Sequence, residues 1–496
     1  MIGYNAKRTK IVATLGPTSR DESTIRQMIR AGMDVARINF SHGKQSEHGE
    51  TITNVRRIAA EENAVVAVMC DIQGPKIRIG KIASGVITLA IGDKVTLTLD
   101  EANGENNIIT LPHPEFMRDI KVGTRLLLDD GKLEFEVKST LPRTLICEVT
   151  VGGPISSNKG ISAPNAKLTL SAITEKDRSD IEYALSQNTD YLAMSFVRSP
   201  NDLQEMRWLI RHTGGAAAII AKIEMHEALE NIQAIIDASD GIMVARGDLG
   251  VEISVEEVPF HQKKIIRLCN EAGKPVITAT QMLNSMEHAP RPTRAEASDV
   301  YNAILDGTDA VMLSNETAAG DYPVRAVETM VNIATIAERN LPPPREFGSA
   351  KPRLPENPEN REAFSDVMAQ ATWKVADALN CKAIITATIS GYTTRQVARV
   401  RPKTPIICVT PSQTTYTRTA LLWGSFPLLV AETFNSVDEM VRIVVNASYK
   451  AKLVDIGDRI VIIAGIPFGA GGQTNFMKLH IVGESGELEI QGAEKV

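Results

Sequence analysis

Residues 216–228, AAAIIAKIEMHEA, join an apolar run to two opposite charges. The unbroken apolar half is typical of a parallel strand that is covered on both faces. Lys222 and Glu224 stand two positions apart, so on a strand they project from the same face. Burial of unpaired charges there would cost several kcal/mol each. The pair therefore indicates that the strand ends at an opening, where a metal ion or an anion balances the charges.

Runs of the same kind recur along the chain, and each is followed by a turn and a helical pattern. Most lie roughly 25 to 35 residues apart, the length of a βα unit, and eight such units close a barrel. The eight runs are KIVATLG (10–16), DVARINF (34–40), VVAVMCD (65–71), DYLAMSF (190–196), AAIIAKIE (217–224), GIMVARGD (241–248), PVITATQ (275–281) and DAVMLSNE (309–316). We therefore predict an α/β fold built on a (β/α)8, or TIM, barrel.

Two further domains are predicted beside the barrel. About a hundred residues between the third and fourth runs alternate polar and apolar positions, which indicates an all-β insert. The stretch LPPPREFGSAKPRLPENPEN (341–360) is a proline-rich linker, and five apolar runs beyond it alternate with helical patterns, as in a doubly wound α/β domain. The predicted division is 1–72 and 169–342 for the barrel, 73–168 for the insert, 343–358 for the linker and 359–496 for the C-terminal domain.

The composition excludes several classes of protein. The 496 residues are 43% hydrophobic and 23% charged, as in a soluble globular protein. With 54 basic and 60 acidic side chains the net charge is −6, so nothing favours a nucleic-acid partner. No apolar stretch approaches the ~20 residues of a membrane span, and no secretion signal is visible. We expect a cytoplasmic protein without a membrane partner, in which the five scattered cysteines are buried and reduced.

Polar side chains end nearly all of the predicted barrel strands, at the face where such barrels carry their active sites. They are Arg37, Asn39, Asp71, Ser195, Lys222, Glu224, Asp248, Thr280, Ser314 and Glu316. Glu224 and Asp248 end consecutive strands, and two neighbouring carboxylates suit Mg²⁺. The alternatives are an ion pair of Glu224 with Lys222 and a helix cap for Asp248. Lys222 itself could be a Schiff-base nucleophile, a point charge for an oxyanion, or a structural partner of Glu224.

Several longer motifs resemble those of the pyruvate kinase family in order and spacing over nearly the whole chain. They include KIVATLGPTS, VARINFSHG, DIQGPKIRIG, SNKGIS, AKIEMHEALENI, SDGIMVARGDLGVE, KPVITATQML, RPTRAEASDV and DGTDAVMLSNETAAGDYP. The resemblance implies the same three-part plan, with the all-β insert acting as a lid. It also implies the glycolytic phosphotransferase reaction, in which phosphoenolpyruvate and ADP give pyruvate and ATP with the help of Mg²⁺ or Mn²⁺.

The resemblance implies roles for individual residues. Arg37 and Lys222 would act on the transferring phosphoryl group, and Thr280 would lie near the carbon that is protonated afterwards. Mg²⁺ would be bound by Glu224 and Asp248. The remaining substrate contacts would come from Ser195 and from the backbone of Gly247 and Asp248, and the nucleotide contacts from Asn39, His42, Arg78 and Lys159. Asp130 matches a position that meets the barrel rim when the lid closes.

The sequence departs from the commonest family pattern near the monovalent-cation positions Asn39, Ser41 and Asp71. Most familiar members have Glu after the GP of this motif and use K⁺, whereas this chain has Lys76. The combination with Ile72, Gln73 and Ile79 is similar to the potassium-independent branch of the family. We therefore expect the Lys76 ammonium to replace the free cation, so that K⁺ is not required. Met225 and Asn315 also depart from the pattern, and nothing in the sequence explains them.

Two glycine- and hydroxyl-rich loops in the C-terminal domain resemble the effector pocket of the family. TATISGYTTRQ supplies Thr388, Ser390, Gly391 and Thr393, and GIPFGAGGQTN supplies Gly469 and Gly471. Hydroxyls and a glycine-rich nest suit a phosphate, so a sugar phosphate or a nucleotide is the expected effector, and flexible surface loops are the alternative. By analogy with the family, the chain is expected to form an allosteric homotetramer.

Two other functions compete with this prediction. A Mg²⁺-dependent carbon–carbon lyase of pyruvate-like acids would use the same barrel without ADP, and it would leave the lid unexplained. A non-catalytic sensor would keep the effector domain on an inactive barrel. The sensor is disfavoured by the presence of the full set of candidate catalytic residues, Arg37, Lys222, Glu224, Asp248 and Thr280.

Overall fold

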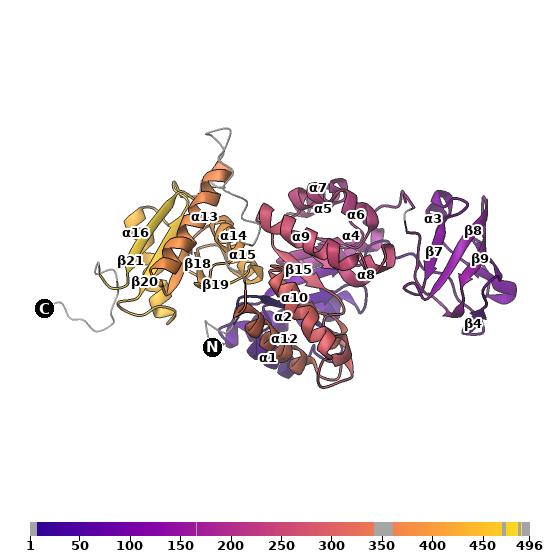
Figure 1. Ribbon diagram of the computed structural model, residues 1–496, viewed down its shortest axis with the longest axis horizontal. Coiled ribbons are helices and arrows are strands. Elements are labelled where there is room, and N and C mark those ends of the chain that lie inside the picture. The colour runs from indigo at the N-terminus through magenta and orange to yellow at the C-terminus, as the bar shows by residue number, and fades with distance from the viewer. Residues whose placement is uncertain (1–6, 165, 342–360, 469–472, 485–487, 489–496) are drawn as a thin grey trace.

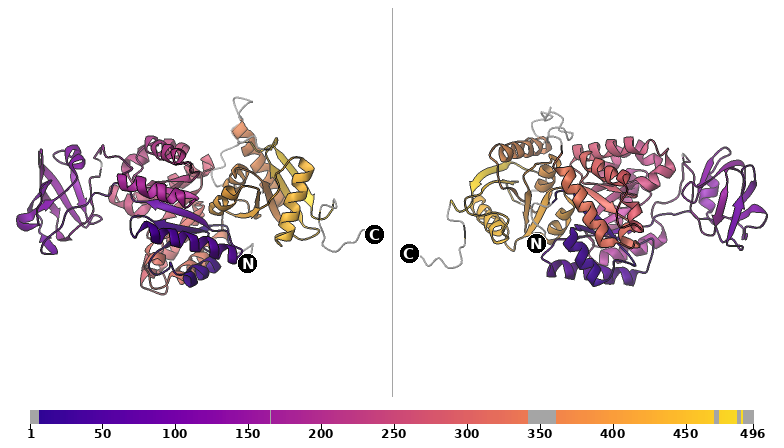
Figure 2. Two further views of the ribbon diagram at one scale, coloured as in Figure 1. Left: turned by 180° about the vertical axis from the view of Figure 1, so that it is seen from behind. Right: turned by 60° about the horizontal axis from the view of Figure 1, so that its bottom comes forward.

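The computed structural model describes residues 7–164, 166–341, 361–468, 473–484 and 488, with no side-chain description for 361–363. The predicted linker 343–358 and the predicted effector residues Gly469 and Gly471 lie outside the described residues. The molecule is elongated, with the barrel in the middle, the β-rich insert at one end and the C-terminal α/β domain at the other (Figure 1). The further views in Figure 2 keep this order.

Eight parallel strands close a barrel in the order β1-β16-β15-β14-β13-β12-β3-β2, which confirms the predicted fold class. These strands are β1 (Lys10–Leu15), β2 (Val35–Asn39), β3 (Ala67–Ile72), β12 (Tyr191–Met194), β13 (Ala218–Ile223), β14 (Gly241–Ala245), β15 (Val276–Ala279) and β16 (Ala310–Leu313). Their residues are almost all buried, because helices cover the outside and side chains fill the inside. Along β1, Ile11 and Ala13 pack outward under the helices, whereas Val12 packs into the interior.

Helices surround the barrel, and short ones stand at its mouth. The outer helices are α1 (Glu22–Ala31), α2 (Gln45–Glu61), α4 (Glu175–Ser186), α5 (Pro200–His212), α7 (Ile232–Ala238), α9 (Val258–Ala272), α10 (Arg294–Leu305) and α12 (Pro323–Glu338). The short elements are α6 (His226–Glu230), α8 (Arg246–Glu252), η2 (Asn284–Glu287) and α11 (Asn315–Ala318). Helix α1 shows how the sequence sets these ends: the Asp21 carboxylate accepts from the Thr24 N–H, and Gly32 stops the helix at φ 117°.

The insert between β3 and α4 folds on its own core, around Phe116 and Phe135. It holds a two-stranded and a six-stranded sheet, as its alternating pattern predicts. The elements are β4 (Val86–Leu89), β5 (Lys94–Thr98), η1 (Glu105–Asn107), β6 (Ile108–Thr110), α3 (Pro114–Asp119), β7 (Arg125–Leu128), β8 (Leu133–Leu141), β9 (Thr144–Val151), β10 (Gly153–Ser156) and β11 (Ile161–Ser162). The Gly74 N–H donates to the Asp177 carboxylate over 3.1 Å, so the chain leaves for the insert beside the start of α4.

The C-terminal domain is a five-stranded sheet with helices, in the strand order β19-β18-β17-β20-β21. Its elements are α13 (Arg361–Ala378), β17 (Ala383–Ala387), α14 (Tyr392–Arg399), β18 (Ile406–Thr410), α15 (Gln413–Arg418), η4 (Thr419–Leu421), β19 (Ser425–Leu429), α16 (Val437–Lys450), β20 (Arg459–Ala464) and β21 (Phe476–Ile481). Separate apolar clusters include alternate residues of the sheet, so both faces are covered. The five predicted runs are all strands, although β21 pairs antiparallel with β20, which the apolar pattern does not reveal.

The C-terminal domain closes the bottom of the barrel. Ala420 and Leu421 of η4 pack into the same apolar cluster as the barrel interior. Beside them Arg401, buried at 3% exposure, donates to Asp309 over 2.7 Å and to the Asn270 side chain over 2.7 Å. The five cysteines are buried and free, as predicted.

Arg401→Ala is expected to destabilise the joint between the barrel and the C-terminal domain. The change leaves the buried Asp309 carboxylate without its cation, and breaking a buried pair in this way costs about 3 to 5 kcal/mol. Calorimetry should therefore show a lower thermal midpoint for Arg401→Ala than for the wild type. Lys382→Ala, which removes an exposed side chain of the same domain, is the control, and equal midpoints for the two variants would contradict the prediction.

Candidate active site

The C-terminal ends of the barrel strands form one side of a pocket of about 250 Å³, and the insert forms the other. The sequence-predicted residues that line it are Arg37, Asn39, Ser41, His42, Lys76, Arg78, Asp130, Ser195, Lys222, Glu224 and Asp248. Within the part of the chain that the structure describes, Asp71, Lys159, Gly247 and Thr280 are not among the lining residues.

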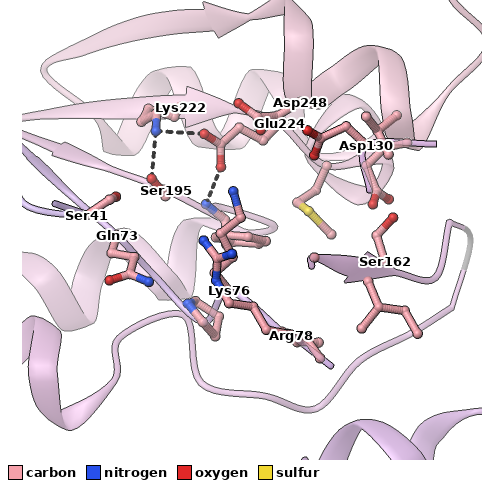
Figure 3. A pocket seen from close by; sticks show the side chains of 18 of the residues that line it. Ser41, Gln73, Lys76, Arg78, Asp130, Ser162, Ser195, Lys222, Glu224 and Asp248 are labelled. Carbon is pink, nitrogen blue, oxygen red and sulfur yellow. Dashed lines mark hydrogen bonds and ion pairs between the residues drawn. The ribbon is translucent and has the colours of Figure 1, made fainter. Parts of the chain in front are cut away.

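Lys222 is the centre of the charged cluster in this pocket (Figure 3). Its Nζ lies 2.8 Å from the Glu224 carboxylate and 3.2 Å from that of Asp71, and it donates to the Ser195 hydroxyl over 2.7 Å. β13 places Lys222 at the mouth, while β3 and β12 bring in the partners from sequence positions far away. These charges are tolerated near the core because each has an opposite charge or a hydrogen bond within contact distance.

The charges of this cluster shift one another's pKa. Burial alone would lower the pKa of Lys222, but Asp71 and Glu224 outweigh it and raise the pKa above its usual value. Burial likewise opposes ionisation of Asp71, yet Arg37 and Lys222 hold the pKa of its carboxyl below the ordinary value. A lysine held this firmly as an ammonium is a point charge and a poor Schiff-base nucleophile at neutral pH.

Arg37 is fixed on the same carboxylate. It donates to Asp71 over 2.7 Å and to the Thr14 hydroxyl over 2.9 Å. Arg37 also lines the pocket, so the guanidinium is oriented there by protein groups before any ligand arrives. Thr14 was not predicted, because a hydroxyl on an apolar strand gives no signal in the sequence.

Glu224 and Asp248 fit a divalent cation. Both line the pocket, and burial together with the charge of Asp248 raises the pKa of Glu224, which Lys222 opposes. In the described residues no three acidic, histidine or cysteine side chains gather into a complete ligand set. Two carboxylates with space for water and substrate oxygens are what Mg²⁺ accepts, since it keeps several non-protein ligands. Asp248 lies in the first turn of α8, whose N-cap is Ala245 without a side-chain hydrogen bond, so the predicted alternative of a helix cap for Asp248 is wrong.

The insert contributes cations to the pocket wall. Lys76 is exposed and lies with Arg78 across the pocket from Lys222 and Glu224 (Figure 3). Arg78 donates to the carbonyl of Asn158 over 2.8 Å. Lys159 instead pairs with Asp129 of the insert over 2.7 Å, so the structure does not bring it into the pocket.

Thr280 lies beside Gly247 rather than on the pocket wall. Its hydroxyl accepts from the Gly247 N–H over 2.7 Å and donates to the Ala279 carbonyl over 2.6 Å. Its φ of +67° is unusual for a threonine, and Arg246 donates to the Thr280 carbonyl over 2.8 Å. A strained residue held by a neighbouring side chain is typical of functional sites.

The monovalent-cation positions are arranged around the same strands. The Asn39 side chain accepts from the Ser41 N–H over 3.1 Å, and both residues line the pocket. Asp71 is already paired with Arg37 and Lys222. The sequence could not show these pairings, which join residues up to 151 positions apart.

The predicted effector residues lie around the start of α14. The Thr388 hydroxyl accepts from the Gly391 N–H over 3.0 Å, and the Thr393 hydroxyl bonds to that of Thr474 over 3.1 Å. Ser390 is exposed, and it lines, with Gly391, a cavity between the C-terminal domain and the barrel.

Glu252 is an acid in the pocket that the sequence did not single out. It is 8% exposed and lies on α8, one turn beyond Asp248. Burial, followed by the charges of Glu227 and Glu224, raises the pKa of Glu252 from its ordinary 4.5 to about 7.

Glu252 is expected to make the metal-free protein less stable as pH rises. Below pH 4.5 the group is protonated in both the folded and the unfolded chain, whereas above pH 7 the folded chain must hold a charge that its surroundings disfavour. The loss builds up between these values and is on the order of 3 kcal/mol at most. Thermal midpoints at pH 5 and pH 8 should differ less for Glu252→Gln than for the wild type. Exposed Glu256→Gln is the control, and an unchanged difference in Glu252→Gln would contradict the assignment.

The fold and the charged mouth of the barrel define an α/β-barrel enzyme with an inserted β domain. The family profiles match "Pyruvate kinase, barrel domain" over residues 6–327 and "Pyruvate kinase, alpha/beta domain" over residues 366–480. The chain belongs to the pyruvate kinase family. It is 45% identical to a pyruvate kinase of Geobacillus stearothermophilus, over 96% of this chain and 81% of the relative. It is 43% identical to a pyruvate kinase of Clostridium perfringens, over 96% of this chain and 99% of the relative.

These matches cover the barrel and the C-terminal domain that the sequence predicts, and they support neither the lyase nor the non-catalytic sensor. Within the described residues, no helix combines the length and the apolar composition of a membrane span.

Proposed function

We propose that this chain transfers the phosphoryl group of phosphoenolpyruvate to ADP, giving pyruvate and ATP in glycolysis. The observation that carries the proposal is the buried Lys222 ammonium, which contacts Glu224 at the mouth of a pyruvate kinase family barrel. A coupled assay tests it: pyruvate should form only when phosphoenolpyruvate, ADP and Mg²⁺ are all present. Pyruvate formation without ADP, or none under any condition, would reject the proposal.

In this proposal Arg37 and Lys222 bind the phosphoryl group and stabilise its developing charge. Arg37 is held by Asp71 and Thr14, and Lys222 by Asp71 and Ser195, so neither cation must reorganise during transfer. Such preorganised charge is most of what a loose phosphoryl-transfer transition state requires. Ser195 contributes by orienting the Lys222 ammonium toward the substrate.

Glu224 and Asp248 would hold Mg²⁺ or Mn²⁺, since both carboxylates line the pocket. When bound, the ion would act as a Lewis acid and neutralise negative charge on the substrate. The substrate carboxylate would bind at the start of α8, to the N–H groups of Gly247 and Asp248. The Gly247 N–H donates to Thr280 before substrate binds, so substrate binding must exchange this hydrogen bond.

Thr280 would act in the second half of the reaction. Breaking the phosphorus–oxygen bond leaves an enolate, and a proton must reach its methylene carbon to give pyruvate. The Thr280 hydroxyl is fixed by Gly247 and by the Ala279 carbonyl, so it can orient a water on that side of the site.

The nucleotide would bind between the barrel rim and the insert. Asn39 and His42 line the pocket from the barrel, and Arg78 lines it from the insert. Lys159 would join them when the insert closes as a lid, which requires it to leave its ion pair with Asp129. Asp130 lines the pocket and would meet the rim in the same movement. Closure would exclude water, which otherwise intercepts the phosphoryl group.

Lys76 would serve as an internal cation in place of K⁺. Lys76 lines the same pocket as Asn39 and Ser41, which supports the idea that its tethered ammonium supplies the charge of a free cation. Activity is then independent of K⁺.

The remaining proposals rest on the family alone. An effector carrying a phosphate, either a sugar phosphate or a nucleotide, would bind at the loop of Thr388, Ser390, Gly391 and Thr393 together with Gly469 and Gly471. The enzyme would be a cytoplasmic, allosteric homotetramer in which the effector favours one arrangement of subunits over another.

A further inference from the structure

A second polar cavity, of about 180 Å³, lies between the bottom of the barrel and the C-terminal domain. The barrel lines it with the residues that lead into β13 and β14, and the C-terminal domain lines it with α14, α15 and η4. Figure 1 shows α14 and α15 on the side of the C-terminal domain that faces the barrel. The cavity is thus at the opposite end of β13 from Lys222.

Three arginines and one aspartate line this cavity. Arg207 is neutralised, because it pairs with Asp240 over 3.2 Å and donates to the Ala238 carbonyl over 2.9 Å. Arg395 donates to the Ser390 carbonyl over a long 3.4 Å, and its guanidinium lies 5.9 Å from the centre of the Tyr392 ring. Arg418 donates to the Ala216 carbonyl, and its Nε is buried without a hydrogen-bond partner in the described part of the chain.

The positive charge of the cavity exceeds its negative charge, because Asp240, which already pairs with Arg207, is the carboxylate that lines it beside three arginines. Among the described residues, neither Arg395 nor Arg418 forms an ion pair with a carboxylate. Burial lowers the pKa of the Arg395 guanidinium, which shows that its surroundings solvate the charge poorly. An anion that entered the cavity would supply the missing balance and accept from several N–H groups at once.

We propose that this cavity binds the phosphate group of a small phosphorylated compound, or inorganic phosphate itself, between Arg395 and Arg418. A tetrahedral dianion matches two unpaired guanidinium groups, and the hydroxyls of Ser390, Thr415 and Thr419 are the further polar groups of the wall. The site is separate from the catalytic pocket. It shares Ser390 and Gly391 with the proposed effector loop but uses cations that the loop does not contain.

A bound phosphate would hold the two domains together. Arg395 and Arg418 come from the C-terminal domain, while Ala216, Ala217 and Asp240 come from the barrel. Ala218 begins β13 and Gly241 begins β14, the two strands that deliver Lys222, Glu224 and Asp248 to the opposite end. The inference concerns binding at this place and does not depend on the proposed reaction.

Hydrogen–deuterium exchange with the full-length protein tests the site, with inorganic phosphate and glycerol 3-phosphate as separate probes. Either probe is expected to slow exchange in residues 388–399 and 415–422. In Arg395→Gln this protection should require at least about tenfold more ligand, as expected for the loss of a charge-assisted hydrogen bond. Protection of residues 37–42 and 76–78, which report the catalytic pocket, should be unchanged in this variant.

Two further variants make the result specific. Arg211→Gln removes an exposed arginine of α5 outside the cavity and should bind as the wild type does. Asp240→Asn keeps an acceptor for the Ile219 N–H but removes the negative charge beside the site, so it should bind phosphate several-fold more tightly. The proposal is overturned if neither probe protects residues 388–399 and 415–422. It is equally overturned if Arg395→Gln is protected at the same concentrations as the wild type.

Discussion

Lys222→Met is expected to lower kcat for pyruvate formation by about a thousandfold, the size of effect that follows loss of a preorganised charge at a transition state. The reason is geometric. The Lys222 Nζ contacts Glu224 over 2.8 Å and Asp71 over 3.2 Å, so it balances two carboxylates before the phosphoryl group arrives. Methionine keeps most of the unbranched side chain and removes the ammonium, with its charge and its hydrogen bond to Ser195. Steady-state kinetics at saturating Mg²⁺ and ADP measures the change.

The control for this variant is Lys44→Met, which removes an exposed ammonium near the barrel rim and should leave kcat within about twofold. Exchange of the methyl protons of pyruvate in deuterium oxide, followed by NMR, reports enolisation without phosphoryl transfer. Both rates should fall if Lys222 stabilises the enolate as well as the phosphoryl group. Near-normal kcat in a folded Lys222→Met protein would remove Lys222 from the mechanism.

Lys76→Glu is expected to convert a K⁺-independent enzyme into a K⁺-dependent one. The substitution replaces an ammonium on the pocket wall by a carboxylate, in the pocket that Asn39 and Ser41 also line, so that oxygen ligands for a free cation are added and the competing charge is removed. Without K⁺ the variant should lose at least about tenfold in kcat/KM, the scale of one lost charge interaction with substrate. Added K⁺ should restore most of the kcat/KM of the variant. The kcat/KM of the wild type should be the same with and without K⁺.

The measurement needs constant ionic strength, because screening alone changes charge interactions in an open pocket. Tetramethylammonium chloride can replace KCl, since that cation is too large for a site of protein oxygens. Lys81→Glu makes the same charge change at an exposed position of the insert and should stay independent of K⁺. Equal rates of Lys76→Glu with and without K⁺ would defeat the idea of an internal cation.

The barrel could be predicted because its signal is local. Each strand is an apolar run, each run ends in polar residues, and the repeat length is that of a βα unit, so strand ends such as Lys222 and Glu224 could be assigned to one mouth. The alternating pattern of the insert is equally local. The antiparallel direction of β21 is not, because an edge strand has the same composition in either direction.

The parts of the site that the sequence missed depend on contacts between distant segments. Asp71 stood among the possible cation ligands, and its pairing with both Arg37 and Lys222 appears only when three strands are brought together. Lys159 matched a nucleotide position, yet in this structure it pairs with Asp129 within the insert. Glu252 was not singled out, since nothing in its neighbours along the chain shows that it is buried.

The hydrogen bond between the Gly74 N–H and the Asp177 carboxylate has a consequence for the history of this architecture. It joins the point where the chain leaves the barrel to the point where it returns. The whole β-rich insert therefore lies within a single βα unit of the barrel. The barrel closes through the β3–β12 pairing whatever the insert contains. The architecture therefore allows an ancestral barrel to acquire, enlarge or exchange the β domain by insertion at this one junction. Such an insertion leaves the strand pairing and the core of the barrel unchanged.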